Sequence, residues 1–213
     1  MRILSTNVAV ARLDPGGAER VSGIDKRPVA RLVVDKPGPN YGDGSGVAGD
    51  TVGDTEHHGG EHKAVYAFSR ERLDWWERKL DRSFACGSFG ENLTTTGIDL
   101  AELLINQRIA VGSTVLEVSV PRSPCRTFAG WIGVDKWQKR FTASGDCGAY
   151  FRVIQPGEIV AGDGLELLDR PDHGITMGMA FRAKMGDQEL ARKVWEARIL
   201  PPMLQHRLDR RFG

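Results

Sequence analysis

Short runs of alternating apolar and polar residues recur along the first 169 positions, separated by clusters of glycine, proline and aspartate. Residues 114–120, Thr-Val-Leu-Glu-Val-Ser-Val, are the clearest case, because alternation with a period of two is typical of a strand with one buried face. We expect strands at 2–10, 28–36, 63–68, 114–120, 149–155 and 164–169. Many short strands with few long helices favour a closed or nearly closed β-barrel, so the predicted fold class is mainly β.

The pattern changes after Arg170, where helical periodicity replaces alternation. Asp187 is a good helix N-cap, and Pro201-Pro202 suits the first turn of a helix. We expect helices at 176–184, 187–198 and 201–211. Three short helices are marginal alone and must dock on a larger core. The sequence therefore predicts a barrel domain at 1–169, with short helices of its own, and a three-helix C-terminal segment at 170–213.

Two features interrupt the predicted strands. Residues 70–80 form an amphipathic helix capped by Ser69, and Asp99 begins a further helical turn. Residues 37–54 contain six glycines and two prolines without periodicity, which indicates a loop that is either functional or mobile. This loop lacks the Gly-Lys-Ser/Thr ending of a P-loop, so we exclude that nucleotide-binding motif.

The composition fits an ordinary soluble protein, with 40% hydrophobic and 27% charged residues among 213. A net charge of +1 argues against a strongly polyanionic partner for the whole chain. No apolar run approaches the roughly 18 residues of a membrane span. The first residues also lack the pattern of a signal peptide. Three cysteines imply no disulfide framework, so the cytoplasm is the expected compartment and no membrane partner is expected.

The segment Pro121-Arg122-Ser123-Pro124-Cys125 places a thiol where a strand ends. The two prolines hold the backbone extended, and Arg122 and Arg126 provide a positive field that favours a thiolate. A thiolate is both a soft metal ligand and a nucleophile. A buried cysteine that only fills space is an equally good interpretation of the local pattern.

A second cluster is Glu56-His57-His58-Gly59-Gly60-Glu61-His62-Lys63. Glycine amides beside histidine and lysine make an anion-binding nest. Zinc binding by His57, His58 and His62 is disfavoured, because the flanking glycines oppose a helix and the spacing is not that of H-E-x-x-H. A solvated loop without function is the other alternative.

A third cluster is Gly87-Ser88-Phe89-Gly90-Glu91-Asn92-Leu93-Thr94. Glycines around Phe89 predict a tight turn that presents backbone N–H groups, and Glu91 and Asn92 add polar side chains suited to a heterocycle. The alternative is a structural turn that Asn92 closes by a bond to the backbone.

Taken in order, these three clusters resemble the MOSC family, the domains related to the C-terminal part of molybdenum cofactor sulfurases. The chain is most similar to bacterial stand-alone members linked to hydroxylaminopurine resistance. Gly148–Val153, Gly157–Asp163 and the tail after Arg170 also look like that subgroup. The resemblance implies a MOSC-type β-barrel with a C-terminal three-helix extension that binds the molybdenum cofactor, a molybdenum–pterin group.

The resemblance also implies site residues, with Cys125 as the thiolate ligand of molybdenum. His57 or His58 would deliver a proton and so join Cys125 in catalysis. Because the cofactor is anionic, Lys63, Arg122 and loop amides would hold it electrostatically. The implied cofactor-binding residues are Gly59, Gly60, Lys63, Phe89, Gly90, Glu91, Asn92, Arg122 and Arg152. Cys86 and Cys147 match no motif position, and we interpret them as structural.

The function implied is an oxidoreductase that reduces N-hydroxylated bases or amines to amines. Since we find no flavin, haem or iron–sulfur motif, electrons would come from a separate reductase partner. The alternative is a carrier of sulfur or cofactor without turnover; the chain has no pyridoxal-phosphate-binding domain with which to mobilise sulfur itself. Nucleic-acid binding by the tail, with a net charge of +4 from Arg170 onward, is less favoured than docking helices. Trp75 or Trp195 marks either a homodimer face or part of the core.

Overall fold

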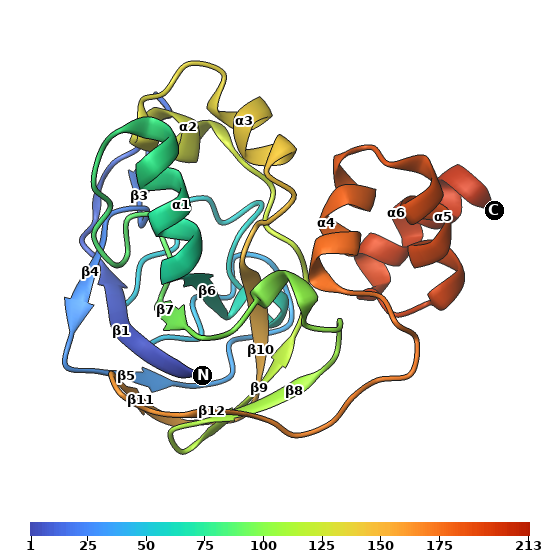
Figure 1. Ribbon diagram of the computed structural model, residues 1–213, viewed down its shortest axis with the longest axis horizontal. Coiled ribbons are helices and arrows are strands. Elements are labelled where there is room, and N and C mark those ends of the chain that lie inside the picture. Colours follow the sequence, from blue (N-terminus) through green and yellow to red (C-terminus); the bar gives the residue numbers. More distant parts are fainter.

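The computed structural model describes residues 1–213, and most of its strands belong to one curled sheet (Figure 1). The strand order is β12-β8-β9-β10-β6-β7-β1-β4, and every pairing is antiparallel except that of β6 with β7. The bounds are β1 (Arg2–Ala9), β4 (Lys26–Val29), β6 (Val65–Ser69), β7 (Leu93–Thr96), β8 (Arg108–Val111), β9 (Thr114–Val118), β10 (Ala149–Gln155) and β12 (Leu165–Leu167). Two small sheets join β11 (Gly157–Val160) to β5 (Arg31–Val34) and β2 (Arg12–Leu13) to β3 (Val21–Ser22).

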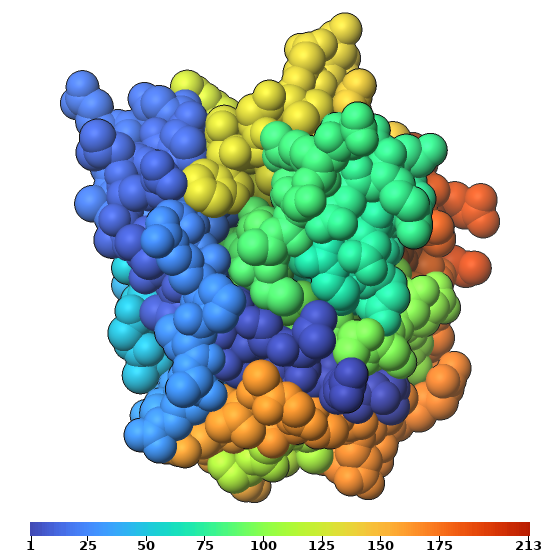
Figure 2. All heavy atoms as spheres, turned by 60° about the vertical axis from the view of Figure 1, so that its left-hand side comes forward, coloured from blue at the N-terminus to red at the C-terminus, as the bar shows by residue number.

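The sheet curls until its two ends nearly meet. The amide of Ile3 donates to the carbonyl of Asp163 at 2.8 Å, and the carbonyl of Ile3 accepts from Gly162 at 2.8 Å. Arg2 and Gly164 form an isolated β-bridge beside these bonds. Figure 2 shows the first residues of the chain lying against the segment that leads into β12. The predicted mainly-β, nearly closed barrel is therefore confirmed.

Helices pack an aromatic cluster against the outside of the barrel. α1 (Arg70–Leu80), α2 (Arg126–Ile132) and α3 (Trp137–Ala143) lie together above the sheet (Figure 1). The ring centroid of Phe89 lies 4.9 Å from that of Phe68 and 5.2 Å from that of Phe128. Phe89 is fully buried, and burying such a ring is worth about 1.5–3 kcal/mol. This cluster fixes the turn that carries Phe89 and the start of α2.

Several predicted elements need correction. The expected strand at 28–36 is two strands, β4 and β5, which turn at Ala30 to pair with β1 and β11 respectively. The expected strand at 63–68 begins with a 3₁₀ turn, η1 (Glu61–Lys63), and only then becomes β6. We did not predict α2 and α3. Each has seven residues, α2 is capped by a cysteine, and α3 has no capping side chain.

The three C-terminal helices are α4 (Met177–Met185), α5 (Gln188–Ala197) and α6 (Pro202–Phe212). They form a group beside the barrel (Figure 1). The side chain of Thr176 caps α4 and that of Asp187 caps α5. The amide of Met177 bonds to the carbonyl of Leu103 at 2.8 Å, next to the 3₁₀ turn η2 (Leu100–Glu102). No helix is both long and apolar enough to cross a lipid bilayer.

The glycine-rich segment at 37–54 packs against the barrel. The amide of Gly46 donates to the carbonyl of Ala64 at 3.0 Å, and that of Ala48 donates to Val33 at 2.9 Å. Val47 is buried between these bonds. These contacts hold the segment against the barrel as an ordered wall. Part of this wall faces the pocket described next.

Candidate functional site

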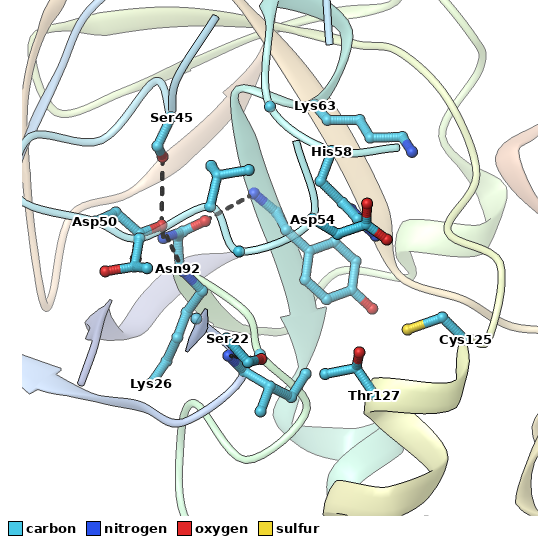
Figure 3. Close-up of a pocket in the computed structure, with 18 of the residues that line it drawn as sticks. Ser22, Lys26, Ser45, Asp50, Asp54, His58, Lys63, Asn92, Cys125 and Thr127 are labelled. Atoms are coloured by element: carbon cyan, nitrogen blue, oxygen red, sulfur yellow. Dashed lines mark hydrogen bonds and ion pairs between the residues drawn. The ribbon is translucent and has the colours of Figure 1, made fainter. Parts of the chain in front are cut away.

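A polar pocket with an empty volume of about 720 Å³ opens between the glycine-rich segment, β6, β10 and the start of α2. In Figure 3 the sulfur of Cys125 points into the pocket from the start of α2, and Lys63 and His58 lie on another side. At the opposite end lie Lys26 and Asp50. The lining is mostly polar and includes several cations.

Cys125 is the N-cap of α2. Its Sγ accepts a hydrogen bond from the amide of Phe128 at 3.4 Å, and its side chain is half-buried. The prolines at 121 and 124 and the rigid helix start hold the thiol in one place. A sulfur that accepts an N–H bond in a pocket lined by Lys63 and Arg122 suits the role of a thiolate ligand.

Arg122 provides a fixed positive charge beneath the thiol. Its side chain is buried, donates to the carbonyl of Phe89, and lies 4.8 Å from the ring centroid of Tyr66. Burial by itself lowers the pKa of Arg122, but nearby Tyr66, Tyr150 and Cys125 raise it above its ordinary value. The guanidinium is therefore charged at every physiological pH.

Lys63 and His58, which both line the pocket, have lowered pKa values. The Nζ of Lys63 lies 4.6 Å from the ring centroid of Tyr41 and 5.7 Å from that of Tyr150. Burial, and then the charge of Lys184, lower the pKa of Lys63 to about 7. Burial, and then the charges of Lys63 and Arg122, lower the pKa of His58 to about 3. At neutral pH, His58 is uncharged and Lys63 is partly protonated.

An ion pair between Lys26 and Asp50 closes the far end of the pocket. Asp50 also accepts from the side-chain amide of Asn92 at 2.8 Å and from the backbone amide of Ala9 at 2.9 Å. Sequence reasoning missed both Lys26 and Asp50. Neither belongs to a motif, and the fold brings them together only because β4 lies beside the glycine-rich segment.

The cluster at 87–94 builds the turn below the pocket. Gly90 and Asn92 line the pocket, as predicted, but Phe89 and Glu91 are fully buried behind it. The carboxylate of Glu91 accepts from the amides of Gly87 at 2.6 Å and Phe89 at 2.9 Å. The side chains of Phe89 and Glu91 do not line the pocket, and their contact with a cofactor stays a prediction. One side chain fills the core and the other closes the turn.

The histidines of the second cluster do not converge. His58 lines the pocket, whereas the exposed His57 lies 3.3 Å from the carboxylate of Asp54. His62 contacts Arg152 at 3.2 Å, outside the pocket. Across the chain no group of three or more His, Cys, Asp or Glu side chains is placed to hold a metal ion.

Two other predicted binding residues lie outside the pocket. Arg152 forms an ion pair with Glu117 at 2.8 Å, which neutralises its charge. It lies two residues after Tyr150 on β10. Gly60 is buried with φ of 72°, and a Cβ there would meet the carbonyl oxygen of Asn40 at 2.1 Å. Gly59 does line the pocket. Glycine at position 60 is thus required by close backbone packing.

The pocket's donors match one kind of cofactor. Cys125 is the one cysteine in the lining, since Cys86 and Cys147 lie elsewhere, and burial raises the pKa of the Cys147 thiol above its usual range. One soft ligand among the cations Lys63 and Arg122 suits an anionic group that brings further metal ligands of its own. The molybdenum–pterin group implied by the resemblance fits this set.

Comparisons with known proteins agree with this arrangement. The family model for the MOSC domain matches residues 54–166. YflK of Bacillus subtilis is 34% identical over 186 residues, which cover 87% of this chain and 81% of YflK. A reductase of Gibberella moniliformis is 32% identical over 138 residues, 63% of this chain but 24% of that protein. The crystal structure of YiiM from Geobacillus stearothermophilus matches with a TM-score of 0.77 and 26% identity, covering 100% of this chain and 99% of that one.

Proposed function

The chain belongs to the MOSC family, and from its pocket we propose that it is a molybdenum-cofactor-dependent reductase of N-hydroxylated bases or amines. The observation that carries the proposal is the thiol of Cys125, held on a rigid helix start in a pocket that Lys63 and Arg122 also line. The name of the Gibberella moniliformis relative, a reductase, supports the same reaction class. The reaction takes up two electrons and two protons and releases an amine and water.

Three residues would hold the cofactor. The thiolate of Cys125 would bind the metal, and Arg122 and Lys63 would neutralise the negative charge of the pterin group. When bound, the cofactor supplies the two-electron chemistry, which no side chain of this pocket provides. The electrons would come from a separate reductase. Arg122 keeps its charge throughout, because its pKa is raised above an already high value.

Lys63 is the proton donor in this proposal. His57, one of the two histidines we expected in this role, is exposed and bound to Asp54. His58 has a pKa of about 3 and therefore carries no proton to give at neutral pH. Lys63, with a pKa of about 7, exists in both forms there, which suits general acid catalysis of the departure of the hydroxyl group.

The test is the molybdenum and pterin content of protein from a cofactor-producing host, followed by hydroxylamine reduction with an artificial electron donor. Cys125→Ser is the best variant, because serine caps α2 as well as cysteine does but is a poor ligand for a soft metal. Cys86→Ser, outside the pocket, is the matched control. We expect metal and activity to disappear in the first variant and to persist in the second.

Two results would contradict the proposal. If Cys125→Ser retained a full complement of molybdenum, the thiolate would not be the ligand. If the wild-type protein held the cofactor but reduced no N-hydroxylated compound, a carrier of the cofactor would be the better interpretation.

A further inference from the structure

A second concave region lies on the other side of the segment that carries Cys125. It is a groove with a cavity volume of about 370 Å³ between Pro121, Ser123 and the helices α4 and α6. Ala180, Val194, Leu200 and Leu204 give it an apolar floor. The volume falls in the range of small-molecule sites.

The groove has cations at its edge and no acidic residue in its lining. Lys184 donates to the carbonyl of Pro121 at 3.2 Å, and Arg207 has no hydrogen bond or ion pair. The nearby Asp209 accepts from Trp195 and Arg198 and does not line the groove. An apolar floor bounded by unpaired cations is complementary to an organic anion with an apolar body.

The groove adjoins the thiol pocket. Along the extended segment, Pro121 and Ser123 face the groove, while Arg122 and Cys125 face the pocket. Residues of this one segment therefore line both cavities, and the segment forms a wall between them. Lys63 lines the pocket and Lys184 lines the groove.

We propose that the groove binds an amphipathic organic anion, with its carboxylate on Lys184 and Arg207 and its apolar body on the floor formed by α4 to α6. The binding of this anion does not depend on the proposed reductase function.

Binding is tested first, by calorimetry with 4-phenylbutyrate and its uncharged amide. We expect one carboxylate site per chain and at least a tenfold weaker Kd for the amide. The double variant Lys184→Gln/Arg207→Gln should weaken carboxylate binding at least tenfold. The matched pair Arg182→Gln/Arg210→Gln removes two exposed charges from the same helices, α4 and α6, outside the groove, and should change Kd less than twofold.

Three results would overturn the groove site: no binding of the carboxylate, equal binding of the amide, or equal weakening by both pairs of substitutions. Sedimentation of the wild type and of Leu204→Asp measures the oligomeric state as a further test. A dimer that this substitution dissociates, together with absent carboxylate binding, would mean that a second copy of the chain covers the groove.

Discussion

Replacing Glu91 by glutamine should destabilise the protein without removing the proposed cofactor. The carboxylate lies in a fully buried turn and accepts from two backbone amides and from the hydroxyl of Thr94 at 2.9 Å. A glutamine keeps one acceptor oxygen but turns an NH₂ group toward one of those amides. Hydrogen bonds to charged groups contribute about 1.5–3 kcal/mol, so one lost bond costs about 2 kcal/mol. For a chain of this size that lowers Tm by about 4–8 °C.

Glu91→Ala should cost more, because it leaves two buried amides without partners at about 1–3 kcal/mol each. The assay is thermal unfolding by circular dichroism, with molybdenum measured per folded molecule. Glu166→Gln, an exposed residue on β12, is the control. A Glu91→Gln protein with wild-type Tm and no molybdenum would refute the reasoning and restore Glu91 as a cofactor contact.

Three further predictions concern the pocket and its walls. Reduction should slow as pH rises through about 7 and Lys63 loses its proton, and Lys63→Gln should lower kcat about 100-fold or more in a pH–rate series. His58 has a folded pKa of about 3, so between pH 6.5 and 3 the unfolded chain binds more protons than the folded one. The free energy of unfolding should therefore decrease by up to about 1.4 kcal/mol for each pH unit by which the pH falls in this window. In urea unfolding, His58→Gln should show a weaker dependence of stability on pH. Gly60→Ala should cost several kcal/mol in urea unfolding through its clash with Asn40, whereas Gly49→Ala, with similar φ and open space, should cost only about 1 kcal/mol. Equal losses in the two glycine variants, an unchanged profile for His58→Gln, or a pH-independent rate would contradict the respective argument.

Local signals predicted much of the fold. The three C-terminal helices were placed to within one residue at each end, because Thr176 and Asp187 provide caps and Pro201 precedes the last helix. The alternation of apolar and polar residues at 114–120 likewise predicted β9. By contrast, α2 and α3 are short helices fixed by the aromatic cluster, which is a tertiary interaction that no local pattern reports.

The candidate site was predicted in part. Cys125, His58, Gly59, Lys63, Gly90, Asn92 and Arg122 all line one pocket. A motif shows which residues belong together but does not separate those that face a ligand from those that support the turn. Phe89 and Glu91 belong to the second kind. The ion pair of Lys26 and Asp50 depends on chain segments that only the folded barrel brings into contact.

The meeting of β1 with the segment before β12 has a consequence for biosynthesis. During translation, the backbone of Ile3 on β1 cannot bond to Gly162 and Asp163 until residues 162–165 have left the ribosome. Contacts this distant in sequence form slowly, whereas the β8–β9 hairpin can form as soon as it emerges. Until the ring closes, the exposed edge of β1 is available to other chains. The nascent barrel is therefore most vulnerable to aggregation just before its last strand appears.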